Sequence, residues 1–448
     1  MNRIALVAAL CASLLTGCIG GEEPTSARPR PNVVVILTDD QPARGTLAVM
    51  PETSEWFRDG GTEFREAFAT TPLCCPSRAS ILTGLYAHNH GIEVEMNQDA
   101  GRLDQSLTIE RYLREAGYRT GYFGKYLNGW PLDVDPPHFD EWAIFGNSAP
   151  HGYYDGDWNV DGRRRRIAEY STTYIADRGT RFIRRAEQDD APWIVFLAPA
   201  APHKPYDAEP RYADAPVGRY RVTAHEPDRS DKPGYVKKRG TSRRNAVNLR
   251  AKQLRTLMSV DDMTGRIHDR LKESGAARDT LAFFLSDNGY LWGQHKLIGK
   301  MTPYTESIRI PLLMMWPGRV QAGIADDRLV TNLDVTATIA EATRLRDGPA
   351  MDGRSLLESF ERDHLLLEFW EAYGRPTWSS LRTSTFQYIE YFDDDSTTPT
   401  FREYYDLTAD PEQLSNLLAD QDPNNDPNVA ALQRRLAKAR RCESDRCP

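Results

Sequence analysis

The chain has 448 residues and a net charge of −8, with 40% hydrophobic and 27% charged residues. This composition is that of a globular protein and excludes a largely disordered chain. The acidic excess argues against a protein that coats nucleic acid, so we expect no nucleic-acid partner. A mean hydropathy of −0.58 excludes a protein with many membrane spans. The length favours one large domain with a smaller one beside it.

The first residues have the pattern of an export signal. Residues 1–17 combine Arg3 with an apolar stretch that is too short to span a bilayer. The letters LTGC that end at Cys18 resemble a bacterial lipobox, which implies cleavage before Cys18 and lipid on its thiol. We therefore expect an exported bacterial lipoprotein, anchored to a membrane through Cys18 outside the cytoplasm. A plain signal peptide with an incidental cysteine is the alternative. Residues 18–31 are rich in Gly, Pro and charge, which predicts a tether.

From residue 32 onward, short apolar runs alternate with amphipathic stretches. Strands are expected at residues 32–37, 119–123, 193–198, 280–285 and 308–316. Helices are expected at residues 51–58, 107–116, 170–185, 248–272 and 334–343. Strands that alternate with helices predict an α/β domain with a largely parallel sheet, and we assign residues 32–348 to it.

The pattern changes near residue 350. Residues 365–369, 379–392 and 403–407 alternate apolar and polar positions without long helices between them, followed by a helix at 429–439. We therefore expect residues 349–448 to form a C-terminal subdomain with a small antiparallel sheet and one helix. Cys442 and Cys447 would close a small disulfide in an oxidising compartment, and two free thiols on a frayed end are the alternative.

Polar side chains follow four of the expected strands of the large domain. In open α/β sheets, ligands bind at the carboxyl ends of the strands, so these side chains should meet at one edge. They are Asp39 and Asp40, Lys125, His203 and Lys204, and Asp287 and Asn288. Carboxylate and amide oxygens are hard donors that suit Ca²⁺ or Mg²⁺ better than zinc. The lysines and the histidine are what an anionic substrate would need.

The most specific motif is CCPSRASILTG at residues 74–84. Pro76 is well placed to begin a helix, which would put Cys74 at the positive N-terminus of that helix. An anion or a nucleophile is stabilised there. The motif therefore indicates that Cys74 is a reactive cysteine rather than a structural one.

These residues closely resemble the sulfatase family. The family signature is C-x-P-S-R followed by a short apolar helix and T-G, and residues 74–84 match it throughout. Similar family segments are PNVVVILTDDQ, FGKYLN, APHKPY, LSDNGY, GQHKLIGK and YYDLTADPEQLSNL. The phrases TPLCCPSRASILTG, HNHG and GKYLN look most like the N-acetylglucosamine-6-sulfatase and extracellular heparan-sulfate 6-sulfatase branch. The resemblance implies an alkaline-phosphatase-like fold, in which helices sandwich a large, mostly parallel sheet.

The resemblance also implies the chemistry of the site. In this family a maturation enzyme oxidises the first cysteine of the motif, here Cys74, to formylglycine. A Ca²⁺ ion would be held by an oxygen of that residue and by the side chains of Asp39, Asp40, Asp287 and Asn288. The positive groups would be Arg78 and Lys125, which hold the hydrated aldehyde, and His203 and Lys300, which contact the sulfate and the leaving oxygen.

One position departs from the pattern of many arylsulfatases, which have G-K-W-H. Leu127 stands where that histidine would be, so this role is not carried over. The expected function is hydrolysis of a sulfate ester on a carbohydrate such as 6-O-sulfated N-acetylglucosamine. A phosphonate or phosphate ester hydrolase of the same superfamily and an inactive glycan-binding lipoprotein are the alternatives.

Residues 229–255 carry ten Lys or Arg and one acidic residue, Asp231. On a chain with a negative net charge, such a cluster would attract a polyanionic glycan. A solvated loop that leads into the long helix is the alternative.

Overall fold

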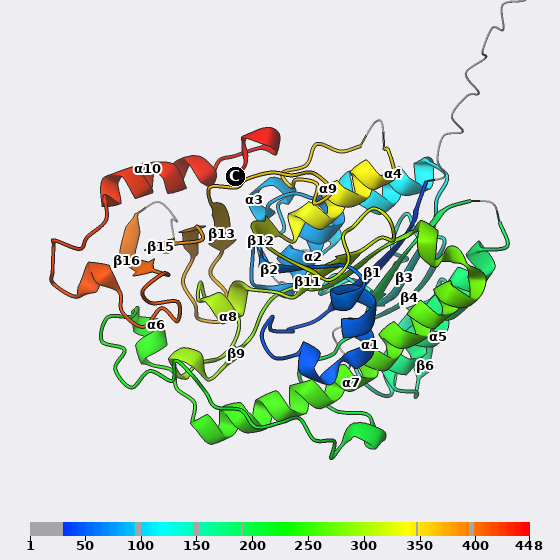
Figure 1. The fold of residues 1–448 in the computed structure, drawn as a ribbon, viewed down its shortest axis with the longest axis horizontal. Coiled ribbons are helices and arrows are strands. Elements are labelled where there is room, and N and C mark those ends of the chain that lie inside the picture. The colour runs from blue at the N-terminus through cyan, green and yellow to red at the C-terminus, as the bar shows by residue number, and fades with distance from the viewer. Residues whose placement is uncertain (1–29, 95–99, 147–151, 190, 346–347, 394–397) are drawn as a thin grey trace, which may run out of the picture.

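The computed structural model describes residues 30–94, 100–146, 152–189, 191–345, 348–393 and 398–448. The expected signal segment, Cys18 and nearly all of the expected tether lie outside these residues. The described chain contains one large sheet with helices on both faces, a small four-stranded sheet beside it, and a further sheet of two short strands (Figure 1).

The large sheet has ten strands among the described residues. In spatial order they are β12 (Ile324–Thr331), β2 (Thr62–Phe68), β11 (Leu312–Met315), β8 (Thr280–Ser286), β1 (Asn32–Thr38), β7 (Trp193–Ala198), β3 (Arg119–Lys125), β4 (Glu141–Phe145), β5 (Gly156–Val160) and β6 (Arg163–Ile167). Only β11 and β5 run against the other strands of this sheet. The prediction of a mostly parallel sheet is confirmed.

Both faces of the large sheet are buried, which explains the uninterrupted apolar run of β1. Side chains alternate along a strand, so Val35 and Leu37 join one core and Val34 and Ile36 join the other. Helices cover both faces (Figure 1). The first core includes residues of α2 (Cys74–Thr83), α4 (Ile109–Glu115) and α9 (Leu333–Ala342). The second includes residues of α5 (Ser171–Ala186) and α7 (Arg243–Ser274).

The small sheet is antiparallel, as predicted. Its strands are β13 (Leu365–Phe369), β14 (Trp378–Arg382), β15 (Phe386–Phe392) and β16 (Pro399–Asp406). Helix α10 (Val429–Ala439) packs on it through Leu436, which joins a core with Leu366 and Tyr388. The expected single strand at 379–392 is a hairpin, because the amide of Thr383 pairs with the carbonyl of Phe386 at 2.9 Å. The division of the chain between residues 348 and 349 stays a prediction.

Several elements differ from expectation. The expected strand at 308–316 begins only at Leu312, because α8 (Thr305–Ile308) precedes it. The expected helix at 51–58 is a short α1 (Pro51–Thr53) continued as a π-helix over Ser54–Asp59. Strands β2, β4, β5, β6 and β12 were not predicted, since polar residues interrupt their apolar pattern. Further short elements include α3 (Ala87–His90), α6 (Gly234–Lys237), β9 (Leu291–Trp292) and β10 (Ile298–Gly299).

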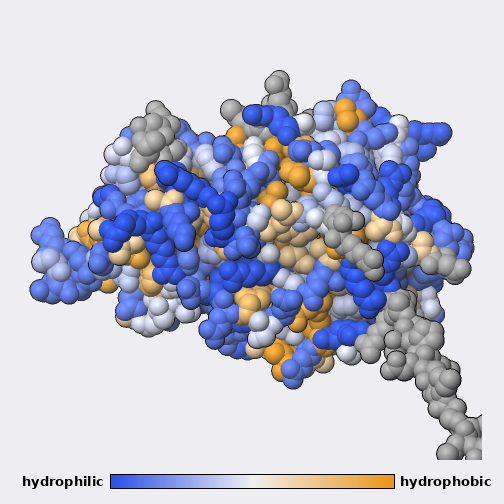
Figure 2. All heavy atoms as spheres, turned by 90° about the horizontal axis from the view of Figure 1, so that it is seen from above, coloured by the Kyte–Doolittle hydropathy of each residue, from blue (hydrophilic) through white to orange (hydrophobic). Residues whose placement is uncertain are grey.

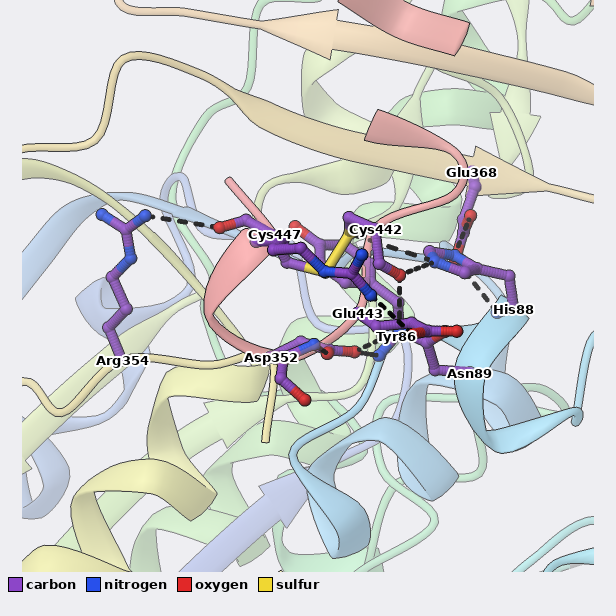
Figure 3. Close-up of a disulfide and its surroundings, with 11 residues drawn as sticks. Tyr86, His88, Asn89, Asp352, Arg354, Glu368, Cys442, Glu443 and Cys447 are labelled. Atoms are coloured by element: carbon purple, nitrogen blue, oxygen red, sulfur yellow. Dashed lines mark hydrogen bonds and ion pairs between the residues drawn. A yellow bond between two sulfur atoms is a disulfide. The ribbon is translucent and has the colours of Figure 1, made fainter. Parts of the chain in front are cut away.

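A disulfide joins Cys442 to Cys447 after α10, so the predicted disulfide of this pair is confirmed (Figure 3). The loop that it closes contacts the segment after α2. His88 lies between two acceptors: its Nδ1 is 2.9 Å from Glu368 Oε2 and its Nε2 is 3.1 Å from the carbonyl oxygen of Cys442. Asn89 Nδ2 also donates to that carbonyl, at 3.0 Å. This contact ties the C-terminal segment to the chain directly beyond the CCPSR motif.

The surface matches the globular composition. Figure 2 shows the face that lies on top in Figure 1, where hydrophilic residues surround smaller groups of apolar ones. The large hydrophobic residues that are exposed among the described residues are Val134, Ile324 and Tyr373. Within the same part of the chain, no helix is both long and apolar enough to cross a membrane.

Candidate functional site

The candidate site begins at the N-terminus of α2. Cys74 is the first residue of this ten-residue helix, and all ten residues are buried. Gly84 ends the helix with a φ of 74°, a left-handed conformation that glycine adopts without strain, which explains the T-G at the end of the motif. The Cys74 thiol donates to Asp39 Oδ1 at 3.2 Å and contacts Lys300 Nζ. The helix thus delivers Cys74 to the carboxyl end of β1.

Acidic side chains from the ends of β1 and β8 meet at this point. One ligand atom each from Asp39, Asp40, Cys74 and Asp287 lie within 4.8 Å of one another, and all four residues are buried. The amide nitrogen of Asp40 donates to Asp287 Oδ1 at 3.2 Å, which links the two strand ends. Asn288 Nδ2 donates to Asp40 Oδ1 at 2.7 Å. The predicted convergence of oxygen donors at the sheet edge is therefore present.

Each carboxylate has a positive partner. Arg78 Nε donates to Asp287 Oδ2 at 2.8 Å. Lys125 Nζ is 2.5 Å from Asp39 Oδ2, and Lys300 Nζ is 2.5 Å from Asp40 Oδ1. The three cations are nearly completely buried, and a buried charge is tolerated only when it is paired in this way. The result is a compact lattice of alternating charges around Cys74.

His203 lies at the entrance to this lattice. Its Nε2 is 3.9 Å from Asp40 Oδ2. Its Nδ1 is 2.8 Å from the carbonyl oxygen of Lys204, and because a carbonyl only accepts, Nδ1 carries a proton there. The other ring nitrogen, Nε2, is the one that faces the carboxylate of Asp40.

The pKa values of Asp39 and Asp287, two carboxylates of this cluster, shift in opposite directions. Burial opposes the charge of Asp39, but Lys125 and His203 outweigh it and hold the pKa of Asp39 well below its usual range. Burial, reinforced by the negative charge of Asp39, raises the pKa of Asp287. Groups whose environments push their pKa values apart are suited to separate roles, with Asp39 as a fixed charge and Asp287 as a proton acceptor.

The thiol of Cys74 is not activated in this environment. Burial and the charges of Asp287 and Asp39 raise its pKa well above the usual value. The activation expected at a helix N-terminus is therefore wrong for the free thiol, because desolvation and two carboxylates outweigh the helix dipole. A neutral thiol is a weak nucleophile.

The lattice opens into a cavity of about 620 Å³. Five of the nine predicted site residues line it, and the other four lie behind them in the contacts above. The five are Asp39, Asp40, Lys125, His203 and Lys300. Leu127 does not line the cavity and is buried in the first hydrophobic core, in agreement with the departure noted in the sequence. The structure thus brings all nine predicted residues together.

The cavity also has walls that the sequence did not reveal. Its lining includes Asn128, Tyr206, Arg239, Tyr290, Tyr373 and Arg375. Tyr206 and Tyr290 stand in the segments APHKPY and LSDNGY, so their place after strand ends was a signal that went unused. Arg375 lies in the connection between β13 and β14, where no sequence pattern indicates a site.

The residues of the basic segment at 229–255 lie in several different environments. Arg239 lines the cavity, whereas Lys232 is fully buried and donates to Tyr405 Oη at 2.9 Å. Residues from Arg243 onward belong to α7. The segment is therefore neither a uniform glycan-binding patch nor a solvated loop throughout.

The oxygen donors fit a divalent cation. Asp39, Asp40, Asp287 and Asn288 offer three carboxylates and an amide oxygen, the hard ligands that Ca²⁺ and Mg²⁺ take. Lys300 Nζ lies among them, 3.1 Å from Asn288 Oδ1 and 2.5 Å from Asp40 Oδ1, so these groups already surround a positive charge.

Comparison with known proteins agrees with this site. A family model described as Sulfatase matches residues 31–345. The chain belongs to the sulfatase family. A second model, described as N-sulphoglucosamine sulphohydrolase, C-terminal, matches residues 293–442. The family predicted from the CCPSR motif is confirmed.

The similar curated proteins are also sulfatases. The chain is 37% identical over 360 residues to an extracellular sulfatase SULF-1 homolog of Drosophila melanogaster, covering 75% of this chain and 32% of that protein. It is 35% identical to a similar extracellular sulfatase homolog of Caenorhabditis elegans, of which it spans 48%. The chain thus spans about a third of the first relative and about half of the second. The N-acetylglucosamine-6-sulfatase of Homo sapiens is 30% identical, over 98% of this chain and 90% of that protein. Both predicted branches are represented.

Solved structures confirm the fold. One with a TM-score of 0.81 and 20% identity covers 91% of this chain and 97% of its own, and is described as a complex with the substrate D-glucosamine-2-N,6-O-disulfate. Another, from Bacteroides fragilis, has a TM-score of 0.75 and 20% identity over 93% of this chain and 96% of its own. The predicted alkaline-phosphatase-like architecture is confirmed.

The predicted localisation is wrong. We expected a bacterial lipoprotein anchored to a membrane through Cys18, whereas the similar proteins include animal sulfatases described as extracellular. The prediction depended on a short apolar stretch and one cysteine, in residues that the structure does not describe. So few positions specify a lipobox that the pattern carries little weight against these relatives.

Proposed function

We propose that this protein is a sulfuric ester hydrolase that removes sulfate from a carbohydrate. The observation that carries the proposal is the contact of Cys74 with Asp39 and Lys300 at the base of a positively lined cavity. Membership of the sulfatase family supports it. The name of one relative, N-acetylglucosamine-6-sulfatase, indicates a candidate substrate. We therefore propose 6-O-sulfated N-acetylglucosamine as the sugar to test first.

In this proposal, a maturation enzyme oxidises Cys74 to formylglycine. The hydrate of this aldehyde supplies a hydroxyl nucleophile and a second hydroxyl for release of the sulfate, which a neutral thiol cannot do. Arg78 and Lys125 hold the residue at position 74 in place, since they border it through Asp287 and Asp39. The raised pKa of Asp287, caused first by burial and then by Asp39, suits it to accept the proton of the attacking hydroxyl.

Asp39, Asp40, Asp287 and Asn288 would hold a Ca²⁺ ion. When bound, this ion offsets the negative charge of the sulfate ester. The lysines of the chain would also offset this charge, because the ammonium groups of Lys125 and Lys300 border the cavity. Their ammonium groups are fixed by Asp39 and Asp40, so little reorganisation is needed when charge shifts during the reaction.

The leaving alcohol needs a proton. His203 lines the cavity and presents Nε2, so it donates to the leaving oxygen when it is protonated. Lys300, which also borders the cavity, is the other candidate for this step. A substitution His203→Gln with a larger effect on poor leaving groups than on good ones would assign the proton to His203.

The test is sulfate release from a panel of sulfated sugars by protein co-expressed with a maturation enzyme. Cys74→Ala is expected to abolish turnover. Cys75→Ala is the matched control, since its buried thiol contacts the carbonyl of Asn128 at 3.7 Å and Cys75 is not a member of the acidic cluster. It should retain most of the activity. Equal losses in both variants would contradict the assignment of the nucleophile.

Mass spectrometry of the peptide that bears position 74 must show the aldehyde before a negative result counts. If the aldehyde is present and no sugar releases sulfate, a panel of phosphonate and phosphate esters tests the alternative hydrolase. An inactive glycan-binding protein would instead retain its glycan affinity after removal of Ca²⁺ and without the aldehyde.

A further inference from the structure

The cavity contains a buried guanidinium that lacks a carboxylate partner. Arg375 is only 8% exposed, lines the same cavity as Lys300, and its Nε has no hydrogen-bond partner within the described residues. No ion pair joins it to a carboxylate in that part of the chain. Buried charges are normally paired, because desolvation without a partner costs several kcal/mol. A buried, unpaired arginine that faces a cavity therefore points to an anionic ligand.

A second arginine lies beside it. Arg239 also lines the cavity, and its Nη2 donates to the carbonyl oxygen of Tyr373 at 3.1 Å, two residues before Arg375. Burial and then the charge of Arg239 lower the pKa of Arg375, so the two guanidinium groups repel each other. An anion between them would relieve this repulsion.

The charges around the cavity are not balanced. Among the described residues that line it, five are Lys or Arg and two are acidic. The two acidic residues, Asp39 and Asp40, are already paired with Lys125 and Lys300. The uncompensated cations are Lys204, Arg239 and Arg375, and they are separate from the lattice around Cys74.

The guanidinium of Arg375 lies close to the reaction centre. A Cβ atom on Gly299 would lie 3.9 Å from Arg375 Nη2, and Gly299 directly precedes Lys300. The guanidinium is thus close to the residue that contacts Cys74. It comes from the β13–β14 connection, so the small sheet supplies this wall of the cavity while the large sheet supplies the reaction centre.

We propose that Arg375 and Arg239 form a second anion subsite, which binds a sulfate or carboxylate group of the substrate other than the ester that is cleaved. The inference rests on the proposed function and narrows it to carbohydrates with at least two anionic groups. A guanidinium suits this role because its planar N–H donors match the two oxygens of such a group. Tyr206 and Tyr290, whose hydroxyls are 2.8 Å apart, border the space for the sugar ring.

The first test compares substrates that differ only in the second anion. The ratio of kcat/KM for D-glucosamine-2-N,6-O-disulfate to that for 6-O-sulfated N-acetylglucosamine is measured in the wild type, Arg375→Gln, Arg239→Gln and Arg244→Gln. Arg244 is the matched control, an exposed arginine of α7 that does not line the cavity. A 6-O-sulfated disaccharide with a uronate provides a carboxylate arm, which distinguishes the two kinds of anion.

We expect the wild type to prefer a doubly anionic substrate. Arg375→Gln should reduce this preference about 10- to 100-fold, mainly through KM, as for the loss of a charged hydrogen bond. Arg375→Lys, which keeps the charge, should restore part of it, and Arg244→Gln should match the wild type. No preference in the wild type for either doubly anionic substrate, or an unchanged ratio in Arg375→Gln, overturns the proposal.

A binding measurement separates this inference from the proposed reaction. Protein with Cys74→Ala is titrated by calorimetry with N-sulfoglucosamine and with a uronate monosaccharide, neither of which has a 6-O-sulfate. Binding of one of them that is lost on adding Arg375→Gln, with an unchanged melting temperature, supports the subsite even if no substrate is hydrolysed. Equal affinity with and without Arg375, or no binding of either, overturns it.

Discussion

Calcium should stabilise this protein through the acidic cluster. The cluster offers the carboxylates of Asp39, Asp40 and Asp287 and the amide of Asn288, held by folding and far apart in the sequence. An unfolded chain does not present them together, so the ion binds the native state. At a free concentration one hundred times the Kd, the stabilisation is about 2.7 kcal/mol. Unfolding 448 residues with about 2.1 cal/mol/K each gives an entropy near 0.9 kcal/mol/K. The melting temperature should therefore rise by about 3 °C.

The decisive variant is Asp40→Asn. Loss of one buried charged ligand costs about 3 kcal/mol, which raises the Kd roughly a hundredfold. At the same calcium concentration the stabilisation falls to about 0.4 kcal/mol, and the shift to about half a degree. The assay is a thermal melt of each protein with Ca²⁺ and with EDTA, so that each variant serves as its own reference.

The matched control is Asp214→Asn, an exposed carboxylate outside the cluster, which should keep the full shift of about 3 °C. If the wild type melts at the same temperature with Ca²⁺ and with EDTA, the cluster is not a calcium site. If Asp40→Asn retains the whole shift, calcium binds elsewhere and the ligand assignment is wrong.

Two further predictions concern stability. Burial lowers the pKa of His88, but the hydrogen bond and charge of Glu368 outweigh burial and raise this pKa to about 9. Both ring nitrogens of His88 face acceptors. This charged contact should add up to about 3 kcal/mol to the free energy of unfolding below pH 6.5, and this contribution should disappear as the pH rises to about 9. In urea unfolding curves, His88→Gln should remove this pH dependence. Arg362→Met should destabilise the fold by about 3–5 kcal/mol in the same assay, because it leaves Asp334 buried and unpaired; a loss below about 1 kcal/mol would contradict this.

The sequence alone determined the motifs of the site. The uninterrupted apolar run of β1 indicates a strand in a sheet that is covered on both faces, which is typical of a parallel sheet. In a parallel sheet, the carboxyl ends of the strands lie at one edge. That rule by itself predicts that Asp39, Asp287 and Lys125 lie together. The CCPSR motif identified the family. Local chemistry and chain order carry this information, so a single sequence suffices for it.

Other features depend on contacts between distant residues. The pKa of the Cys74 thiol is raised because the residue is buried against Asp287 and Asp39. Its position at the N-terminus of a helix, taken alone, predicts a lowered pKa. The strands β2 and β12 were missed because their pairing, rather than their composition, makes them strands. Arg375 reaches the cavity only because the small sheet lies against the large one.

There is a physical reason why the sequence predicts some of these features and others depend on the tertiary structure. The residues proposed to act on the sulfate ester stand in short motifs at the ends of strands, because the sheet positions them by its own geometry. The residues proposed to select the rest of the substrate come from connections such as the one between β13 and β14, and no periodic pattern governs where those connections lie. The sequence therefore determined the family, the fold class and the motifs that meet in the candidate site, while the tertiary structure decided the protonation of the thiol and the second wall of the cavity.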